Sequence, residues 1–344
     1  MTATKLRWGI LSTGKIAHRF AEALSKSSSG QLVAVASRTS EDAAKFAEQH
    51  DVPRAHADYA ALLENPEVDA VYIAPPHPMH REWAIRCAEA GKHILCEKPA
   101  GMNRAEVEEM IGAARKHGVF FMEAFMYRCH PQTETLRNLI RSDEIGPIRM
   151  IHATFSYYLG EYDPSHRLVA RALGGGSILD IGCYGVSMAR MVAGEVLGKR
   201  HTEPEEVRGF ARLEPGEKTD LTAAAILRFP GGLIAMIQSG LQLHGTNEVL
   251  LEGELGTITL NRPWGIYPGE AEIRIHKHKG GETRTLLSGT PDHDLYGFEI
   301  DAVALAVAEG RQQTPEMDWE DSLGNAAVLD AWLAEAGVSY RQSV

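Results

Sequence analysis

The stretch from Gly9 to Ile16, "GILSTGKI", has the glycines and the lysine that phosphate-binding loops use. Read from Gly9, it is one residue away from the Walker A loop GxxxxGK[ST], which needs Ser or Thr for Mg²⁺ where this chain has Ile16. Read from Ser12 to Ala17, it is one residue away from the dinucleotide fingerprint GxGxxG/A, because Ser12 replaces the first glycine. The elements that flank the loop therefore have to decide between the two ligands.

A second set of residues could move a proton. In "GGGSILDIGCYG", Asp180 and Tyr184 are four residues apart and would share one face of a helix. Taking hydride from an alcohol needs a base for the hydroxyl proton, and a tyrosine, whose ordinary pKa is about 10, needs roughly 4 kcal/mol of phenolate stabilisation to serve near pH 7. Lys98, at the end of an apolar strand, is the cation that could supply it. Two alternatives stay open: Asp180 could complete a capping box that begins at Ser177, and Tyr184 could be a core tyrosine.

The first 126 residues consist of alternating strand-like and helix-like segments. Short apolar runs predict strands, and longer stretches with helical spacing predict the helices between them. The predicted strands cover residues 7–12, 31–37, 68–76, 92–98 and 119–125, and the predicted helices cover residues 14–27, 40–51, 79–91 and 104–118. Strands that are apolar throughout and alternate with helices indicate a parallel sheet covered on both faces.

The order of strand, loop, helix and strand around Ser12 favours a dinucleotide over a triphosphate. Gly14 would let the backbone approach the pyrophosphate, and the amide groups of the next helix would face its oxygens. The second strand ends in "VASRTS", where Arg38 between hydroxyl residues suits a ribose 2′-phosphate and no carboxylate precedes Glu41. We therefore expect NADP, with NAD less favoured, the alternative being that Arg38 is a solvated surface residue. The predicted cofactor contacts here are Gly9, Ser12, Thr13, Gly14, Lys15, Ile16, Ser37, Arg38 and Thr39.

The pattern changes after residue 126, which predicts a dinucleotide-binding Rossmann domain over residues 1–126 and a second domain over residues 127–344. Alternating runs joined by Gly turns indicate a mainly antiparallel sheet within an α+β domain, and we expect this domain to bind the substrate. The predicted strands cover residues 148–159, 222–242, 247–263 and 271–279, and helices are predicted near residues 131–141, 177–190, 298–310 and 319–337. Met236, Leu250 and Ile258 suggest a partly apolar sheet face, so we expect a homodimer through this sheet.

Composition excludes several classes of partner. The chain of 344 residues has 44% hydrophobic and 24% charged residues, as expected of a globular protein with two domains. Its formal net charge of -11 and scattered basic residues argue against nucleic acid. No long apolar run predicts a membrane span or a signal peptide, and we expect a cytoplasmic location. The four cysteines form no C-x-x-C pair, so we expect reduced thiols and no metal site.

Several motifs together resemble a known family. Glu97-Lys98-Pro99 in "HILCEKPAGMN", the N-terminal fingerprint and "GGGSILDIGCYG" resemble the glucose-fructose oxidoreductase, inositol dehydrogenase and rhizopine-catabolism (Gfo/Idh/MocA) superfamily over essentially the whole chain. Within it, "LRWGILSTGKIA", "CEKPAGMNRAEVEEM" and "MEAFMYRCHP" are most similar to dimeric dihydrodiol dehydrogenases, which also act as NADP-dependent D-xylose 1-dehydrogenases. Those relatives also carry Ser at the position of Ser12. The resemblance implies a Rossmann domain followed by a domain on an open antiparallel sheet that often forms oligomer contacts.

The resemblance also implies roles for individual residues. Lys98, Asp180 and Tyr184 occupy the catalytic positions of the dihydrodiol dehydrogenases, whereas most other members of the superfamily have His where Tyr184 stands. Arg128 is similar to a family arginine near the active site, with a surface ion pair as the alternative. Met126 stands where dihydrodiol dehydrogenases have Trp, which argues against an aromatic substrate wall.

Further residues are expected near the cofactor. Glu97 could hydrogen-bond the cofactor or fix its own loop. Two histidines in "APPHPMH" lack a carboxylate or thiolate at ligand spacing, so the end of the fourth strand is expected to line the nicotinamide ribose and not a metal. These additional predicted cofactor contacts are Pro75, Pro76, His77, His80, Glu97, Lys98 and Arg128.

These observations predict an NADP-dependent oxidoreductase that transfers hydride between the nicotinamide and a small cyclic polyol, aldose or trans-dihydrodiol. Tyr184 would be the general acid and base, assisted by Lys98 and Asp180. An alternative within the superfamily is a reductase of 1,5-anhydro-keto sugars. An alternative of another class is a regulator that binds NADP without catalysis, although such a sensor does not need the proton-transferring residues.

Overall fold

The computed structural model describes residues 5–266, 271–288 and 294–340, which form two compact units. Unit 1 consists of Met1–Gly101, Ala105–Cys129 and His293–Ser322, and unit 2 consists of Met102–Arg104, His130–Asp292 and Leu323–Val344. Each unit is therefore discontinuous in sequence. The division of the chain between residues 126 and 127 stays a prediction.

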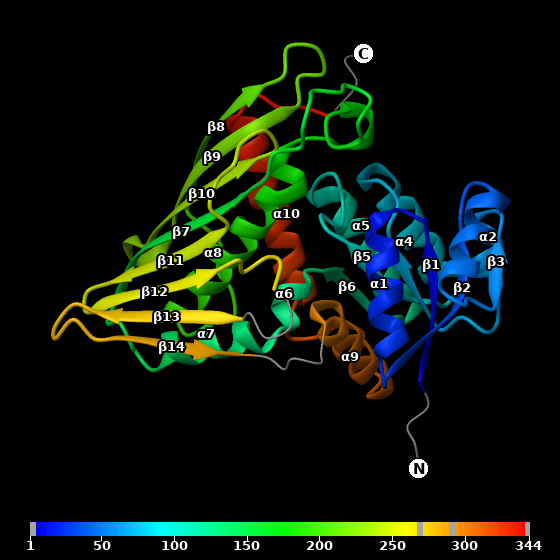
Figure 1. Cartoon of the computed structure of the whole chain (residues 1–344), viewed down its shortest axis with the longest axis horizontal. Coiled ribbons are helices and arrows are strands. Elements are labelled where there is room, and N and C mark those ends of the chain that lie inside the picture. Colours follow the sequence, from blue (N-terminus) through cyan, green and yellow to red (C-terminus); the bar gives the residue numbers. More distant parts are fainter. Residues whose placement is uncertain (1–4, 267–270, 289–293, 341–344) are drawn as a thin grey trace. The chain divides into compact units, whose positions relative to one another are not determined.

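Unit 1 is built on a six-stranded sheet with the order β3-β2-β1-β4-β5-β6 (Figure 1). All neighbouring strands in it are parallel. The strands are β1 (Leu6–Leu11), β2 (Gly30–Ala36), β3 (Arg54–His56), β4 (Ala70–Ile73), β5 (His93–Glu97) and β6 (Phe121–Ala124). The helices are α1 (Lys15–Lys26), α2 (Ser40–Gln49), α3 (Tyr59–Leu63), α4 (His80–Glu89), α5 (Arg104–His117), α6 (Met126–Cys129) and α9 (Leu295–Ala308).

The strand order explains where a ligand can bind in unit 1. The chain starts at β1, builds outward through β2 to β3, and then returns to place β4 on the other side of β1. In open parallel sheets, ligands bind at the carboxyl ends of the strands beside this reversal. β4 is buried at every residue and β1 at all but one, as expected for a parallel sheet covered on both faces. The predicted Rossmann fold is confirmed.

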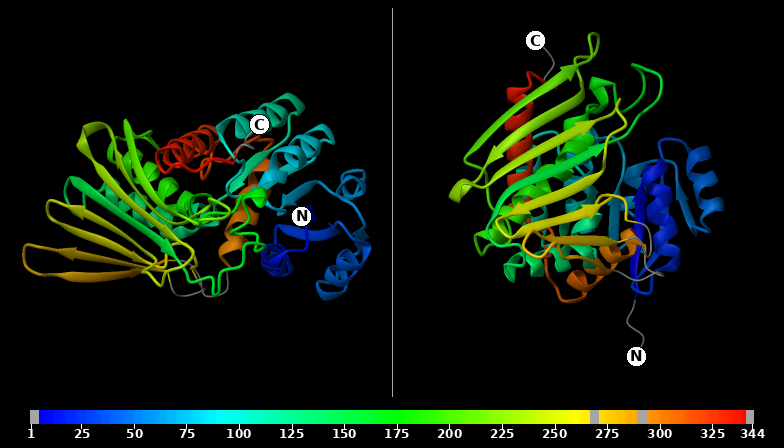
Figure 2. Two further views of the ribbon diagram at one scale, coloured as in Figure 1. Left: turned by 90° about the horizontal axis from the view of Figure 1, so that it is seen from above. Right: turned by 60° about the vertical axis from the view of Figure 1, so that its left-hand side comes forward.

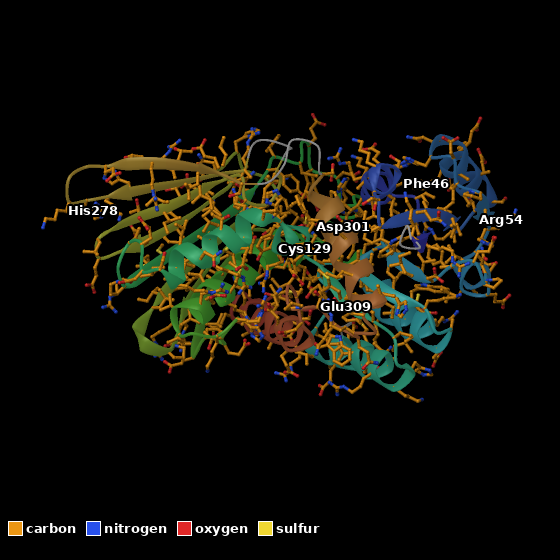
Figure 3. All side chains as sticks on the ribbon, turned by 90° about the horizontal axis from the view of Figure 1, so that it is seen from below. Phe46, Arg54, Cys129, His278, Asp301 and Glu309 are labelled. Atoms are coloured by element: carbon orange, nitrogen blue, oxygen red, sulfur yellow. The ribbon has the colours of Figure 1, made fainter. Side chains whose placement is uncertain are left out.

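The C-terminal part of the chain contributes to unit 1 as well. Helix α9, on which Figure 3 labels Asp301, contacts α1 and α6. The Asp301 carboxylate accepts a hydrogen bond from the hydroxyl of Ser29, which precedes β2. Strand β3 and helix α3 were not predicted, because three and five residues are too short to show a period.

Unit 2 is built on an eight-stranded sheet with the order β14-β13-β12-β11-β7-β10-β9-β8. Its strands are β7 (Ile148–Ser156), β8 (Glu206–Leu213), β9 (Asp220–Arg228), β10 (Ile234–Gly240), β11 (Glu248–Gly253), β12 (Gly256–Asn261), β13 (Glu272–Lys277) and β14 (Thr283–Leu287). The helices are α7 (Pro131–Arg141), α8 (Cys183–Val196) and the larger part of α10 (Trp319–Glu335). These helices lie on one face of the sheet (Figure 2).

The sheet of unit 2 is antiparallel except at one pair of strands. β7 runs parallel to β10, and the other neighbouring pairs are antiparallel. This confirms the predicted mainly antiparallel sheet. The outermost strands, β8 and β14, were not predicted. Most of their residues are exposed or only half-buried, so neither strand shows the regular alternation of buried and exposed residues that marks a half-buried strand.

The strand registers define the sheet face away from the helices. Met236 on β10 is paired with Ile226 on β9, and both side chains are about half exposed. Leu250 on β11 lies in the same row across β7. The prediction for Ile258 is wrong: its side chain is fully buried on the helix side, because it pairs with buried Leu251 rather than with Leu250. Ile226, Met236 and Leu250 therefore share one row of the open face, in which His152 on β7 lies between Met236 and Leu250.

Candidate functional site

The first predicted contact loop follows β1 in unit 1. Ser12 has a φ of 89°, a left-handed conformation that favours glycine. Ser12 thus adopts the tight-turn conformation for which the dinucleotide fingerprint usually has its first glycine. Gly14 precedes α1 in an extended conformation, no side chain caps this helix start, and the first turn contains no acidic residue. The amide N–H groups that begin α1 are thus suited to an anionic ligand.

Hydroxyl groups gather beside this loop. The hydroxyls of Thr13 and Ser37 lie 3.4 Å apart, which joins the ends of β1 and β2. The Ser12 hydroxyl accepts a hydrogen bond from the amide of Gly14 at 3.3 Å and also bonds to the Tyr59 hydroxyl. Tyr59 was not predicted. Tyr59 lies in helix α3, far from the loop in sequence, and only the folded chain places it beside Ser12.

Arg38 and Thr39 follow β2 and behave differently from one another. Arg38 is exposed, and its positive charge opposes the rise in the pKa of Tyr59 that burial causes. Thr39 is the N-cap of α2: its hydroxyl accepts from the amide of Asp42 at 3.2 Å and donates to the Asp42 carboxylate at 2.7 Å. Arg38 is the better placed of the two to meet a phosphate. The role predicted for Thr39 stays a prediction.

Gly9 has a packing role. It lies inside β1, where an added Cβ would come within 2.8 Å of Leu62 and 3.1 Å of Val68. The absence of a side chain thus serves the contact between β1 and the segment that carries α3. The predicted contact of Gly9 with the cofactor stays a prediction.

The end of β4 is tied to the loop after β5 by His80. The His80 ring is fully buried, with Nε2 2.9 Å from the Pro75 carbonyl and Nδ1 3.0 Å from the Pro99 carbonyl. Burial lowers the pKa of His80 to about 4 against the effect of these carbonyls, so the ring is neutral near pH 7. Pro76 is half-buried and His77 is buried beside it. His80 therefore holds the two loops together, and its predicted contact with the cofactor stays a prediction.

Glu97 and Lys98 end β5. The Tyr72 hydroxyl donates to Glu97 Oε1, and the Lys98 amide donates to Glu97 Oε2 at 3.1 Å. These bonds support the interpretation in which Glu97 fixes its own loop. Lys98 is half-buried, and its peptide bond to Pro99 is cis.

Arg128 is inside unit 1. It pairs with Asp321 on α10, and both side chains are 1% exposed, while its Nε donates to the Glu316 carbonyl at 3.1 Å. This is a buried ion pair, whereas the alternative considered from the sequence was a surface pair. The predicted contact of Arg128 with the cofactor stays a prediction.

Unit 2 contains the other two predicted catalytic residues. Asp180 lies in a π-helical turn, Ile178–Gly182, that leads directly into α8, and Tyr184 is in the first turn of α8. The Tyr157 hydroxyl, just after β7, donates to Asp180 Oδ2 at 2.7 Å. Burial and the negative charge of Asp180 raise the pKa of Tyr157 well above its usual value, so Tyr157 keeps its proton. The capping box is wrong, because Ser177 makes no side-chain cap to this helix.

Aromatic rings surround Tyr184. Its ring meets Phe155 edge-on at 5.3 Å between centroids and Trp264 at 5.6 Å, and Phe155 and Trp264 stack at 6.0 Å. Trp264 is anchored by a 2.9 Å hydrogen bond from its Nε1 to the Thr154 carbonyl. Unit 2 thus has an aromatic group around Tyr184, while the inference from Met126 about the substrate wall stays a prediction. The run "FSYY" in a predicted strand was the available signal for two of the missed rings, Phe155 and Tyr157.

Within residues 5–266, 271–288 and 294–340, no group of three or more His, Cys, Asp or Glu side chains is arranged to hold a metal ion. In the same described part of the chain, no helix has the length and apolarity needed to cross a membrane.

The fold and these loops define a dinucleotide-binding oxidoreductase, and comparison with known families agrees. The oxidoreductase family described as Gfo/Idh/MocA with an NAD-binding Rossmann fold matches residues 6–125, and the C-terminal domain of the same family matches residues 133–259. The chain belongs to the Gfo/Idh/MocA family of oxidoreductases. The resemblance inferred from the motifs is confirmed.

Three relatives extend this comparison. The trans-1,2-dihydrobenzene-1,2-diol dehydrogenase of Xenopus laevis is 35% identical over 343 residues, which cover 97% of this chain and 99% of the relative. A 3-ketoreductase from Actinomadura kijaniata, solved with NADP and TDP-benzene, has a TM-score of 0.86 and 30% identity and covers 97% of this chain and 98% of its own. An aldose-aldose oxidoreductase from Caulobacter crescentus, solved with glycerol, has a TM-score of 0.86, 27% identity and the same coverage. Other structures of the 3-ketoreductase have one lysine or one tyrosine replaced.

The Arg128–Asp321 pair generates a prediction about stability. Asp321→Ala leaves a buried guanidinium without its carboxylate, which should lower the free energy of unfolding by about 3–5 kcal/mol. Glu309→Ala removes the carboxylate of an exposed pair with Arg311 and should cost about 1 kcal/mol or less. Urea unfolding followed by circular dichroism measures both variants. Equal, small losses would show that Arg128 does not depend on Asp321.

Proposed function

We propose that the chain is an NADP-dependent dehydrogenase that oxidises a hydroxyl group of a small cyclic polyol, aldose or trans-dihydrodiol, and reduces the corresponding carbonyl in reverse. The observation that carries the proposal is Tyr184, a nearly buried phenol among aromatic rings, next to a carboxylate on the same helical segment. The full-length similarity to dihydrodiol dehydrogenases supports the substrate class. The aromatic rings would pack against the apolar face of a ring-shaped substrate.

In this proposal, Tyr184 takes the substrate's hydroxyl proton and returns it in the reverse reaction. Lys98 supplies the positive charge that makes a phenolate accessible, and Asp180 orients the reacting group. Two tyrosines, Tyr157 and Tyr184, are near Asp180, and only one of them can serve as the general base. Tyr157 is excluded as the base because its pKa is raised and its proton is held by Asp180.

The residues of unit 1 fit a dinucleotide phosphate. The uncapped start of α1 supplies amide donors for the pyrophosphate, and exposed Arg38 supplies a guanidinium for a 2′-phosphate. NADP, when bound, supplies the nicotinamide carbon that accepts hydride. The NADP in a 30% identical neighbour supports this cofactor. The loop held by His80, Glu97 and Tyr72 would keep Lys98 in place beside it.

A reductase of keto sugars is the second proposal within this family, as in the predicted alternative for 1,5-anhydro-keto sugars. The likeness to a 3-ketoreductase favours it, and the same residues would act in the opposite direction. A regulator that only binds NADP is disfavoured, because such a protein has no use for a tyrosine and carboxylate held in this way.

The first test of the proposed function concerns the cofactor. Arg38→Ala should weaken NADP binding about tenfold or more, because a charge-assisted hydrogen bond contributes about 1.5–3 kcal/mol, and should leave NAD binding nearly unchanged. Titration of each cofactor by fluorescence gives both dissociation constants. Arg54→Ala, an exposed arginine on β3 of the same unit, is the control. Equal losses for NADP and NAD would reject the assignment of Arg38.

The second test concerns the base. Tyr184→Phe should lower kcat about 10²–10⁴-fold with NADP affinity kept, since general acid–base catalysis contributes that much. Lys98→Met should cost as much, and the double variant should lose little more if the two act as a unit. Reduction of NADP, followed by absorbance with D-xylose, inositols and trans-1,2-dihydrobenzene-1,2-diol, measures this. Tyr157→Phe is the matched control and should lose far less. Near-normal turnover by Tyr184→Phe from pH 6 to 9 would contradict the role.

We also propose that the chain forms a homodimer through the open face of the unit 2 sheet. Ile226 is 50% exposed and Met236 is 43% exposed, and they share a row with half-buried Leu250. Phe210 on β8, at 83% exposure, extends the apolar surface toward the sheet edge. Exposed apolar side chains that gather on one sheet face are typical of an interface between identical subunits.

The dimer is tested by charging this surface. The wild type should scatter light with twice the chain mass of 37.7 kDa at micromolar concentration, and the double variant Ile226→Lys, Met236→Lys should approach the chain mass. Leu305→Lys, at a residue 57% exposed on α9 of unit 1, is the control and should leave the mass unchanged. A monomeric wild type would overturn the proposal.

A further inference from the structure

The helical segment that carries Asp180 and Tyr184 starts in the interior of unit 2, and one buried carboxylate holds its first residues. Asp220, at the start of β9, is 0% exposed. Its Oδ2 accepts hydrogen bonds from the Ile178 amide at 2.6 Å and from the Ser177 hydroxyl at 2.8 Å. The Ser177 hydroxyl in turn lies 2.9 Å from that of Ser239 at the end of β10. β9 is thereby tied to Ile178, where the π-helical turn begins, and both β9 and β10 are tied to Ser177 just before it.

The backbone before the turn is shaped around the same carboxylate. Gly176 has a φ of 126°, and an added Cβ would lie 2.3 Å from Asp220 Oδ1 and 2.8 Å from the Tyr340 hydroxyl. Only glycine fits there. The Tyr340 hydroxyl donates to the Gly175 carbonyl at 2.5 Å, which fixes the other side of the glycine run.

We infer that Asp220 is a positioning residue for the reaction: it sets the π-helical turn so that Asp180 meets Tyr157 and Tyr184 faces its aromatic neighbours. The inference rests on the proposed function, because it assigns a task to the helical segment that carries the proposed base. Asp180 is two residues beyond Ile178, and its own amide bonds to the Gly176 carbonyl at 3.2 Å. A change at Asp220 therefore reaches Asp180 through one short stretch of backbone.

The surroundings of Asp220 explain why its charge matters. Burial raises the pKa of Asp220 to about 6, although the bonds from Ile178 and Ser177 oppose the rise. Tyr340 faces the carboxyl group and Arg171 lies near Tyr340, while Asp180 is on the turn itself. Glu214 and Lys218 are on the turn that leads into β9. Asp220 is thus a carboxylate above about pH 6 and binds the helix start less strongly below it.

The test compares Asp220→Ala with Asp220→Asn, which keeps an acceptor oxygen. Alanine should lower kcat about tenfold to a hundredfold with the NADP dissociation constant unchanged, because small misplacement of a reacting group has effects of that size. Asparagine should restore kcat to within about fivefold, the difference between a charged and a neutral acceptor. The wild type should exceed the asparagine variant at pH 8 and converge with it at pH 5. D-xylose and trans-1,2-dihydrobenzene-1,2-diol are the probes.

Hydrogen exchange gives a readout that needs no substrate. Amides of residues 178–184 should exchange faster in Asp220→Ala and stay protected in Asp220→Asn, with no change in Asp294→Ala, which removes the cap of α9 in unit 1. If Asp220→Ala does not fold, Ser177→Ala should give the same pattern more weakly. Unchanged exchange and unchanged kcat in the alanine variant would overturn the inference. Tyr184→Phe is measured in parallel: if it retains kcat, the proposed base is wrong, whatever the result at Asp220.

Discussion

The amide groups at the start of a helix have no partner within the helix, and much of this molecule's chemistry depends on where they find one. In unit 1, the start of α1 is left without a cap, next to a loop in which Ser12 adopts a left-handed conformation. Its donors are free to meet phosphate. In unit 2, the segment that leads into α8 begins in the interior, where solvent cannot satisfy an amide. Asp220 meets that need from a distant strand. The amide groups at the start of α1 are thus left for a ligand, whereas the first amide of the segment leading into α8 is bonded to Asp220.

Burying the charged Asp220 carboxylate costs free energy, and its hydrogen bonds offset that cost only in part. Its Oδ2 accepts two hydrogen bonds, while its Oδ1 has no bonding partner within the described residues. The raised pKa of Asp220 reflects this imbalance. Because the proton is held more tightly in the folded chain than in the unfolded one, this group stabilises the fold most at low pH. That contribution falls as pH rises from about 4 to about 6. A group that weakens the fold at neutral pH is more simply explained by positioning than by stability.

The spacing of apolar residues along the sequence predicts much of the fold. Most of the wrong predictions concern features that this spacing cannot show. The parallel sheet of unit 1 was predictable because its strands are apolar throughout and separated by helices. Ile258 shows the limit: a strand exposes alternate residues, so an assignment displaced by one residue places a side chain on the wrong face. The local spacing of Ser177 and Asp180 imitates a capping box, but Ser177 donates to Asp220, 43 residues away. No local pattern contains that contact. Trp264 beside Tyr184 is hidden for the same reason.

The two tyrosines near the π-helical turn show how one carboxylate can give similar side chains different tasks. Asp180 accepts the Tyr157 proton in a hydrogen bond, and its charge makes loss of that proton harder. Any carboxylate near the proposed base would act on Tyr184 in the same direction. The hydrogen bond from Tyr157 disperses part of the Asp180 charge and lessens this effect. Under the proposed roles, the positive charge of Lys98 therefore has to stabilise the Tyr184 phenolate by more than the remaining negative charge of Asp180 destabilises it. Asp180 thus keeps Tyr157 as a hydrogen-bond donor, whereas the proposed base needs a positive charge to lose its proton.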